Sequence, residues 1–425
     1  MANQFISFLV LSIKFVIDNV GALLSLLNIH LIPLNYEQAI KGMNKVHYEH
    51  IKKDKFFMKN LKLMMNGLSN ASDITLTGRF IYYNQLYDVI KSRYNFDNYV
   101  KENPKVRNVD IKNPVFIVTL PRTGSTFMHV TMQQDKRWYC PEVWLQNVLV
   151  PPPSNPLSES DNKVIKEVDW RLGIAKYLWG KRIESAHPLF ARSPEDILMN
   201  LMCVGAQFYM AMVINNLDDY MDYLMNLDKS TWVEMYRSIK LMMQCYMYNY
   251  PTERLLTMSH SPYTNVAALL EVFPDAKIVT IHRDPAKSLA SITSLLGMSS
   301  SQFFSIFGRD LKVMGDNVSD MCLKGTNLLL EQREELEEKD KTENRFIDVY
   351  FKDIVRNPME TFKDLYEKLE MPWTDEWERT CKTYITSQRE HKKGTHSYKD
   401  NLIRKEYYHK QFSDYIKKFS IELNL

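Results

Sequence analysis

A short buried strand that leads directly into a tight turn and a helix is the feature that most constrains the fold of this chain. Val115 to Leu120 form a nearly continuous apolar run rich in β-branched residues, which is typical of a strand inside a parallel sheet. The turn after it contains Arg122 and Gly124, and residues 127–132 form an apolar segment suited to a helix. Backbone N–H groups and the positive end of the helix dipole converge at such a helix start, so this turn is predicted to bind an anion.

The side chains of the same turn also suit an anion. Arg122 supplies a cation, and Ser125 and Thr126 supply hydroxyl donors. The turn lacks the GxxxxGK[ST] pattern with which P-loop proteins bind a magnesium nucleotide. A nucleotide kinase or hydrolase is therefore the less favoured interpretation of this loop.

A second strand-to-helix junction predicts a second anion site. Lys277 to His282 form another short β-branched run, Arg283 follows it, and Ser291 lies eight residues later in the predicted helix. An arginine and a serine placed in this way can hold a phosphate from two sides. Two such sites at neighbouring strand ends indicate a nucleotide that carries two separate phosphates.

Predicted strands and helices alternate along the chain. A third strand is expected over residues 345–350, and helical segments are expected at 36–66, 80–93, 162–217 and 230–247. This alternation favours an α/β fold with a P-loop-like three-layer core, in which helices flank a central parallel sheet, plus an N-terminal helical extension.

The two junctions resemble those of the PAPS-dependent sulfotransferase family. They read PRTGST over residues 121–126 and FPDA over 273–276 with HRDP over 282–285. The resemblance runs from about Val115 to Tyr398. It implies a helical extension over residues 1–100 and a sulfotransferase-like domain over residues 101–425 with a helical insertion at about 160–250.

The resemblance also implies which residues bind 3′-phosphoadenosine-5′-phosphosulfate (PAPS). In that family the first loop holds the 5′-phosphosulfate and the second element holds the 3′-phosphate. Carried over to this chain, the expected 3′ site is Arg283 and Ser291. The expected 5′ site consists of Arg122, Thr123, Gly124, Ser125 and Thr126. Lys393 and Gly394, in a basic stretch with turn residues, are expected either to close over the nucleotide or to form a solvated loop.

The residue that removes the proton of the acceptor is left open among three candidates. Glu142 lies where related sulfotransferases often place a catalytic carboxylate, and His187 and His260 lie in family-like motifs. His260 stands where many relatives have lysine, and Leu145, after Trp144, stands where many have glutamate. With Arg122, these three candidates form the predicted catalytic set.

Two further motifs receive structural interpretations. His129 lies in the apolar helix after the first loop and is expected to pack in the core. The stretch from Ser193 to Asp196 is interpreted as a helix start, with Ser193 as the N-cap and Pro194 as the first helical residue.

The charge and the cysteine content of the chain limit which partners and which cellular compartment we expect. Lys and Arg number 54 against 51 Asp and Glu, a net charge of +3, so nucleic acid is not an expected partner. The five cysteines are widely spaced and no histidine or cysteine pattern suggests a metal site. We therefore expect a reducing, cytoplasmic location and a reaction without a metal ion.

The segment from Phe5 to Leu34 departs from this cytoplasmic pattern. It is apolar apart from Lys14 and Asp18, and it lacks the features of a cleaved signal peptide. Its polar residues share one helical face, which predicts an amphipathic helix: Ser7, Lys14, Asp18, Gly21, Ser25 and Asn28. Docking on the protein's own core and contact with a membrane are both open for this helix.

Together these observations predict an enzyme that moves the sulfuryl group of PAPS to a hydroxyl of a small acceptor. Segments rich in Met, Phe and Tyr at about 176–247 and 298–307 favour a lipophilic or aromatic alcohol, and a carbohydrate stays open. The alternatives are a P-loop kinase or hydrolase and a catalytically silent, sulfotransferase-like binding protein. The sequence does not indicate the oligomeric state.

Overall fold

The structure is a computed structural model of the chain. It describes residues 2–27, 29, 31–71, 73–180, 183–214, 217–250, 253–305, 310–339, 344–390 and 402–423.

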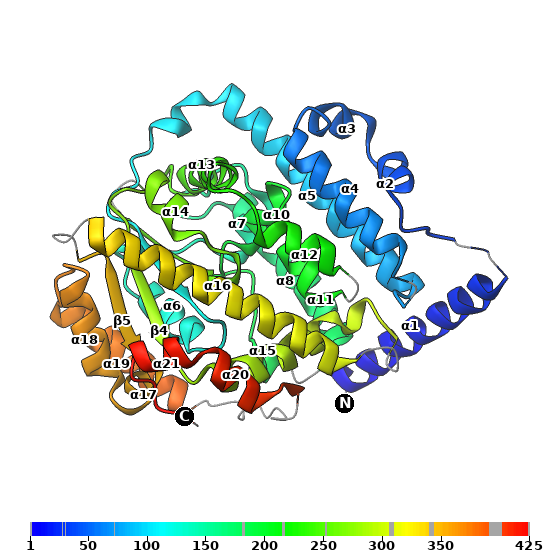
Figure 1. Cartoon of the computed structure of the whole chain (residues 1–425). Coiled ribbons are helices and arrows are strands. Elements are labelled where there is room, and N and C mark those ends of the chain that lie inside the picture. The colour runs from blue at the N-terminus through cyan, green and yellow to red at the C-terminus, as the bar shows by residue number, and fades with distance from the viewer. Residues whose placement is uncertain are drawn as a thin grey trace.

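A five-stranded parallel sheet forms the centre of the fold (Figure 1). The strand order is β2-β3-β1-β4-β5, and each strand pairs in parallel with its neighbours. The strands are β1 (Val115–Thr119), β2 (Trp138–Tyr139), β3 (Arg254–His260), β4 (Lys277–His282) and β5 (Phe346–Tyr350). The α/β class with a central parallel sheet, predicted from β1, β4 and β5 alone, is confirmed.

Helices cover both faces of the sheet, because successive strand residues point to opposite sides. Val115 and Ile117 belong to a core formed with residues of α6, α17, α18 and α19, whereas Phe116 and Val118 belong to the larger core that contains residues of α13 to α16. The helices of the first face are α6 (Ser125–Gln133), α17 (Phe351–Arg356), α18 (Pro358–Lys368) and α19 (Asp375–Glu390). Those of the second are α13 (Lys229–Tyr246), α14 (Val266–Val272), α15 (Pro285–Ser299) and α16 (Leu311–Lys339).

In the described part of the chain before β1, five α-helices precede the sheet. The expected helix stop at Asn66-Gly67 is wrong, because α4 continues to Ser69 and buries Met65 and Leu68 in the core. The helix expected from Phe80 is also longer at both ends. The five are α1 (Ala2–Leu26), α2 (Tyr36–Gly42), α3 (Lys45–Ile51), α4 (Lys55–Ser69) and α5 (Leu76–Glu102), and a 3₁₀ turn, η1 (Pro104–Asn108), follows.

The region between β2 and β3 is helical but interrupted. The expected helix start at Ser193 is wrong: Pro194 and Asp196 form isolated bridges with Glu142 and Met258, and the next helix begins at Leu198. The helices here are α7 (Val143–Val148), α8 (Glu159–Trp179), α9 (Ile183–Ala186), α10 (Leu198–Cys203), α11 (Phe208–Val213) and α12 (Asp218–Met225).

Short helical elements complete the fold around the strand ends. Two 3₁₀ turns, η2 (Ser261–Tyr263) and η3 (Ser300–Gln302), follow β3 and α15, and the chain ends with α20 (Lys405–Gln411) and α21 (Ser413–Lys418). In Figure 1 α20 lies next to α15, and α21 lies close to β4.

Candidate active site

The turn after β1 has a backbone suited to an anion-binding loop. Arg122 and Gly124 adopt positive φ angles of 69° and 91°, and α6 begins at Ser125. The first N–H groups of a helix have no partner within the helix, so those at the start of α6 suit an anion. A Cβ atom added to Gly124 would lie 3.2 Å from the ring of Phe351, so both the φ angle and the space favour glycine here.

Thr123 fixes this loop to the sheet. Its buried Oγ1 donates a hydrogen bond to the Leu120 carbonyl at 3.0 Å and lies 3.1 Å from Thr119 Oγ1. Thr119 in turn donates to the Ile281 carbonyl of β4 at 2.6 Å. The Thr123 side chain therefore supports the loop and links it to the neighbouring strand.

The structure brings the two predicted phosphate sites together, because β1 and β4 are neighbours in the sheet. Arg122 Nε donates to Ser291 Oγ at 3.2 Å, and Arg283 Nη1 donates to the Arg122 carbonyl at 2.6 Å. The Arg283 guanidinium also lies 4.2 Å from the centre of the Phe351 ring. Two guanidinium groups and the N-terminus of α6 thus meet at one end of the sheet, next to Ser291 of α15, a set of donors that fits two phosphates.

A buried polar network holds the strand end that carries Arg283. His282 contacts Tyr415 of α21 at 3.0 Å and Asp348 of β5 at 2.8 Å, and Arg333 binds Asp348 with two hydrogen bonds. Burial raises the pKa of Asp348, but the bonds from His282 and Arg333 outweigh it, and the pKa lies well below its ordinary value.

The next residue along is held in the same way. The Asp284 carboxylate caps α15 at the Ala286 N–H (2.9 Å) and lies 2.8 Å from His409 Nε2 of α20. Sequence reasoning missed this network, although an aspartate directly before a proline is a recognisable helix-start signal.

His187 lies beside the first loop and forms a pair with Glu195. Arg122 Nη2 donates to the carbonyl of Ala186, the residue before His187, at 2.9 Å. His187 Nε2 lies 3.0 Å from Glu195 Oε2, while the Asp196 N–H donates to Glu195 Oε1 at 3.1 Å. Burial raises the pKa of Glu195, but the interactions with His187 and the Asp196 N–H outweigh it, so the pKa is lowered. Glu195 was missed as a site residue because its motif was interpreted as a helix start.

His260 ends β3 next to Thr119 of β1. Its Nδ1 lies 3.2 Å from the Thr119 carbonyl, and its Nε2 lies 3.8 Å from Asp196 Oδ2. Burial lowers the pKa of His260 to about 4, so this imidazole is neutral near neutral pH. Burial, followed by the charge of Glu195, raises the pKa of Asp196 to about 7, although the Tyr263 hydroxyl donates to its carboxylate.

Glu142, the third candidate base, is held by other groups. Trp144 Nε1 donates to its carboxylate at 2.7 Å and Arg192 Nε donates at 3.3 Å. Burial raises the pKa of Glu142 against these interactions. Its described contacts therefore connect it to Trp144 and Arg192, whereas His260 contacts Thr119 of β1 and His187 directly follows Ala186, whose carbonyl binds Arg122.

Of the remaining residues considered from the sequence, one lies in the core and two lie outside the described part of the chain. His129 is buried, contacts the Leu256 carbonyl at 3.4 Å and has a pKa lowered by burial to about 4, so its interpretation as a core residue is confirmed. Lys393 and Gly394 lie outside the described residues. Within the described ranges, no group of three His, Cys, Asp or Glu side chains could hold a metal ion, and a reaction without metal stays a prediction.

Comparison with known proteins identifies the family. Residues 114–375, more than half of the chain, match the model of the sulfotransferase family, so the chain belongs to that family. It is accordingly an enzyme of the PAPS-dependent sulfotransferase class, as the sequence predicted.

Two solved structures share its fold. Sulfotransferase STF9 from Mycobacterium avium has a TM-score of 0.78 at 20% identity, over 92% of this chain and 98% of that chain. Sulfotransferase STF1 from Mycobacterium tuberculosis H37Rv has a TM-score of 0.71 at 18% identity, over 90% of this chain and all of that chain. No curated protein matches the sequence.

Proposed function

We propose that this sulfotransferase binds PAPS across the ends of β1 and β4 and sulfates a hydroxyl of a small lipophilic or aromatic alcohol. The loop of Arg122 to Thr126 holds the 5′-phosphosulfate, and Arg283 with Ser291 holds the 3′-phosphate. The observation that carries this assignment is the pair of bonds that join Arg122 to Ser291 and Arg283 to the Arg122 backbone. A ligand with two phosphates can then contact both sites at once, because these bonds hold the two sites in a fixed relative position.

We assign the proton-accepting role to His187. Both carboxylate oxygens of Glu195 already accept hydrogen bonds, one from the Asp196 N–H and one from His187, if His187 carries its proton on Nε2. That tautomer leaves the Nδ1 lone pair of His187 to accept a proton, and the carboxylate stabilises the imidazolium that forms. Glu195 is thus a positioning residue that acts through His187.

The transfer step forms one bond, breaks one bond and moves one proton. The acceptor oxygen forms a bond to sulfur, the bond between sulfur and the bridging phosphate oxygen breaks, and the acceptor proton passes to His187. Adenosine 3′,5′-bisphosphate leaves with the bonding electrons. Arg122 and the N–H groups at the start of α6 stabilise the charge that develops on the leaving phosphate.

The acceptor is assigned from the side chains of the helical insertion. Apolar and aromatic residues such as Phe208, Tyr209, Met210 and Met212 are frequent there; Tyr209 is partly exposed and the other three are buried in the core. Apolar pockets with few polar groups suit alcohols that carry rings or alkyl chains.

A transfer assay with labelled PAPS and a panel of phenols, hydroxysteroids, fatty alcohols and sugars tests this proposal. His187→Asn is expected to reduce turnover by about 10²–10⁴-fold, the usual contribution of a general base. Glu195→Gln removes one charge-assisted bond and is expected to reduce it by about 10–10²-fold. Because Glu195 acts through His187, the double variant is expected to be no slower than His187→Asn.

Glu184→Gln replaces an exposed carboxylate in α9, the short helix that ends directly before His187, and is the matched control that should leave turnover unchanged. Unimpaired transfer by His187→Asn would contradict the assignment of the base. Binding of the bisphosphate without transfer to any acceptor would favour the catalytically silent alternative.

A further inference from the structure

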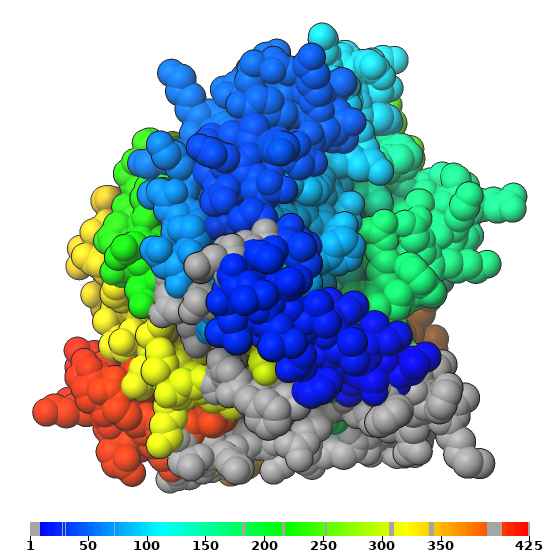
Figure 2. Space-filling model, turned by 90° about the vertical axis from the view of Figure 1, so that its right-hand side faces the viewer, coloured from blue at the N-terminus to red at the C-terminus, as the bar shows by residue number. Residues whose placement is uncertain are grey.

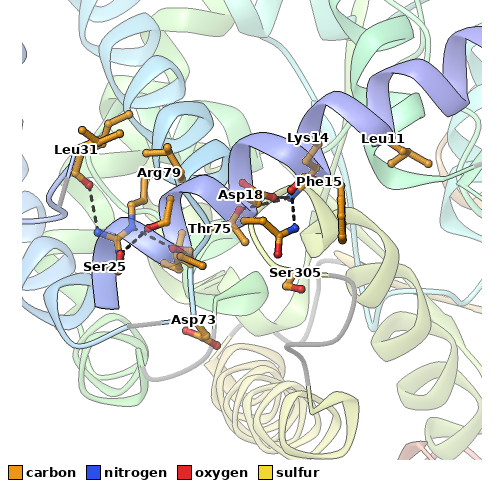
Figure 3. Close-up of a pocket in the computed structure, with 16 residues that line it drawn as sticks. Leu11, Lys14, Phe15, Asp18, Ser25, Leu31, Asp73, Thr75, Arg79 and Ser305 are labelled. Carbon is orange, nitrogen blue, oxygen red and sulfur yellow. Dashed lines mark hydrogen bonds and ion pairs between the residues drawn. The ribbon is translucent and has the colours of Figure 1, made fainter. Parts of the chain in front are cut away.

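Helix α1 lies on the body of the protein with its polar side inward. Lys14 is 8% exposed; its ammonium pairs with Asp18 and donates to the Phe304 carbonyl at 3.3 Å and to Thr75 Oγ1 at 3.4 Å (Figure 3). The Thr77 N–H donates to the Asp18 carboxylate at 2.9 Å. Lys14, Asp18 and Gly21 of the polar stripe expected from the sequence therefore lie on the surface by which α1 docks on α5 and on the loop after η3. The side chain of Ser7 and the residue Asn28 of that stripe lie outside the described part of the chain.

A glycine sets how closely the two helices approach. A Cβ atom on Gly21 would lie 2.7 Å from Leu76 Cβ at the start of α5. Arg79 then fixes the chain that leaves α1, because its guanidinium donates to the carbonyls of Ile74 and Ile32 (Figure 3). These contacts hold α1 flat along the body at both its middle and its C-terminal end.

The opposite side of α1 is apolar and faces away from the protein. The segment from Leu9 to Leu26 is long and apolar enough to cross a membrane, and almost none of it is buried. Its outward large side chains are each 42–82% exposed: Leu9, Ile13, Val16, Ile17, Val20, Leu23 and Leu26. Leu11 and Phe15 line the pocket between α1 and the body. An uncovered apolar surface of this extent marks a binding site.

The two exposed polar side chains within residues 9–26 form hydrogen bonds inside the helix. Asn19 Nδ2 donates to the Phe15 carbonyl at 2.7 Å, and Ser25 Oγ donates to the Gly21 carbonyl at 2.9 Å. The only charged residues of α1 are Lys14 and Asp18, and both are on the docked side. Lipid requires internal hydrogen bonding of this kind, whereas a protein partner normally meets a polar rim with free donors and acceptors.

A local excess of positive charge follows directly in the chain. Residues 36–69 contain seven lysines and three acidic residues, an excess of four charges, which is more than the net +3 of the whole chain. All seven lysines are exposed: Lys41, Lys45, Lys52, Lys53, Lys55, Lys59 and Lys62. Figure 2 shows this segment and α1 on the same face of the molecule.

We propose that this face binds the surface of a lipid bilayer with anionic headgroups. The apolar side of α1 enters the interface parallel to the membrane plane, and the lysines of α2 to α4 contact the headgroups. The helix lies on the membrane and does not cross it, because crossing would pull the Lys14–Asp18 pair out of its contacts with Thr75, Thr77 and Phe304.

Cosedimentation of the purified full-length chain with vesicles tests this proposal, with phosphatidylcholine alone or with phosphatidylserine added. The chain is expected to bind the anionic vesicles at least about tenfold more tightly than the neutral ones. Val16→Glu combined with Leu23→Glu places two charges on the outer side and is expected to weaken binding at least about tenfold. Val355→Glu, a similarly exposed valine on α17, is the matched control and should bind like the wild type.

Several outcomes would overturn the proposal. They are the absence of binding to either vesicle, unchanged binding of the double variant, or equal binding to neutral and anionic vesicles. A solution dimer that the double variant abolishes would assign the face to a second copy, and resistance to alkaline carbonate extraction would assign α1 as a spanning helix. Unchanged binding of adenosine 3′,5′-bisphosphate by the double variant shows that it is folded and keeps this test separate from the catalytic one.

Discussion

Replacing Arg283 with alanine should affect two nucleotides to very different extents. Adenosine 3′,5′-bisphosphate carries both phosphates, whereas AMP carries only the 5′-phosphate. If Arg283 binds the 3′-phosphate, the variant loses a charge-assisted interaction of about 1.5–3 kcal/mol with the bisphosphate alone, about 10–150-fold in Kd.

The structure adds a smaller effect that both ligands share. Arg283 Nη1 also donates to the Arg122 carbonyl at 2.6 Å, so its removal loosens the 5′ loop. One such bond contributes about 1 kcal/mol, or about fivefold in Kd. The bisphosphate is therefore expected to bind about 50- to several hundred-fold more weakly, and AMP only about fivefold more weakly.

Isothermal titration calorimetry without added magnesium measures both values. Arg283→Lys keeps the charge but loses the planar donor pair, so an intermediate loss for the bisphosphate is expected. An equal loss for both ligands would show that Arg283 only supports the loop, and no loss for either would refute the 3′ site.

Three further predictions address the loop, the buried carboxylates and α1. Gly124 has a φ of 91° and lies against Phe351, so Gly124→Ala should lower the free energy of unfolding by about 1–2 kcal/mol in denaturant titrations. It should also weaken the binding of adenosine 3′,5′-bisphosphate in calorimetry. Unchanged values for both would show that the loop does not require glycine at this position. The pKa of Asp196 is raised to about 7, so its carboxyl favours the folded state below pH 4 and this contribution is lost as the pH rises through 7. Asp196→Asn should consequently lose less stability than the wild type between pH 5 and 8, by about 2–3 kcal/mol, whereas parallel denaturation profiles would refute the raised pKa. Lys14→Ala leaves the Asp18 carboxylate without its pair in the docked interface, so amide hydrogen exchange in α1 should accelerate while exchange in β1 stays the same; slow exchange in α1 would show that the pair does not hold the helix.

The sequence predicted those strands whose local residue pattern matches the burial that they have in the fold. The β-branched runs of β1, β4 and β5 are buried strands, and the loops after β1 and β4 meet because parallel neighbours end at the same edge. β3 was missed because Arg254 to His260 contains leucine, methionine and serine in place of a β-branched run, and its pairing with β1 decides its conformation.

Local sequence patterns did not predict which side chains pair within the site. His187 and Glu195 lie eight residues apart in the sequence, and the turn between them, which no periodicity encodes, brings them within 3.0 Å. The side by which α1 docks was likewise undetermined, because an amphipathic pattern defines two faces without stating which one the protein covers. The buried hydrogen bond from Lys14 to the Phe304 carbonyl, 290 residues away, determines which face the protein covers.

The polar network around His282 and Asp284 also has a consequence for biosynthesis. Its partners Tyr415 and His409 lie in α21 and α20, 133 and 125 residues after the residues that they contact. A nascent chain that has completed the sheet still lacks the two side chains that fix the turn carrying Arg283. The nucleotide site therefore becomes competent only after α20 and α21 have been synthesised, and a chain truncated before α20 would lack the support of the 3′-phosphate turn.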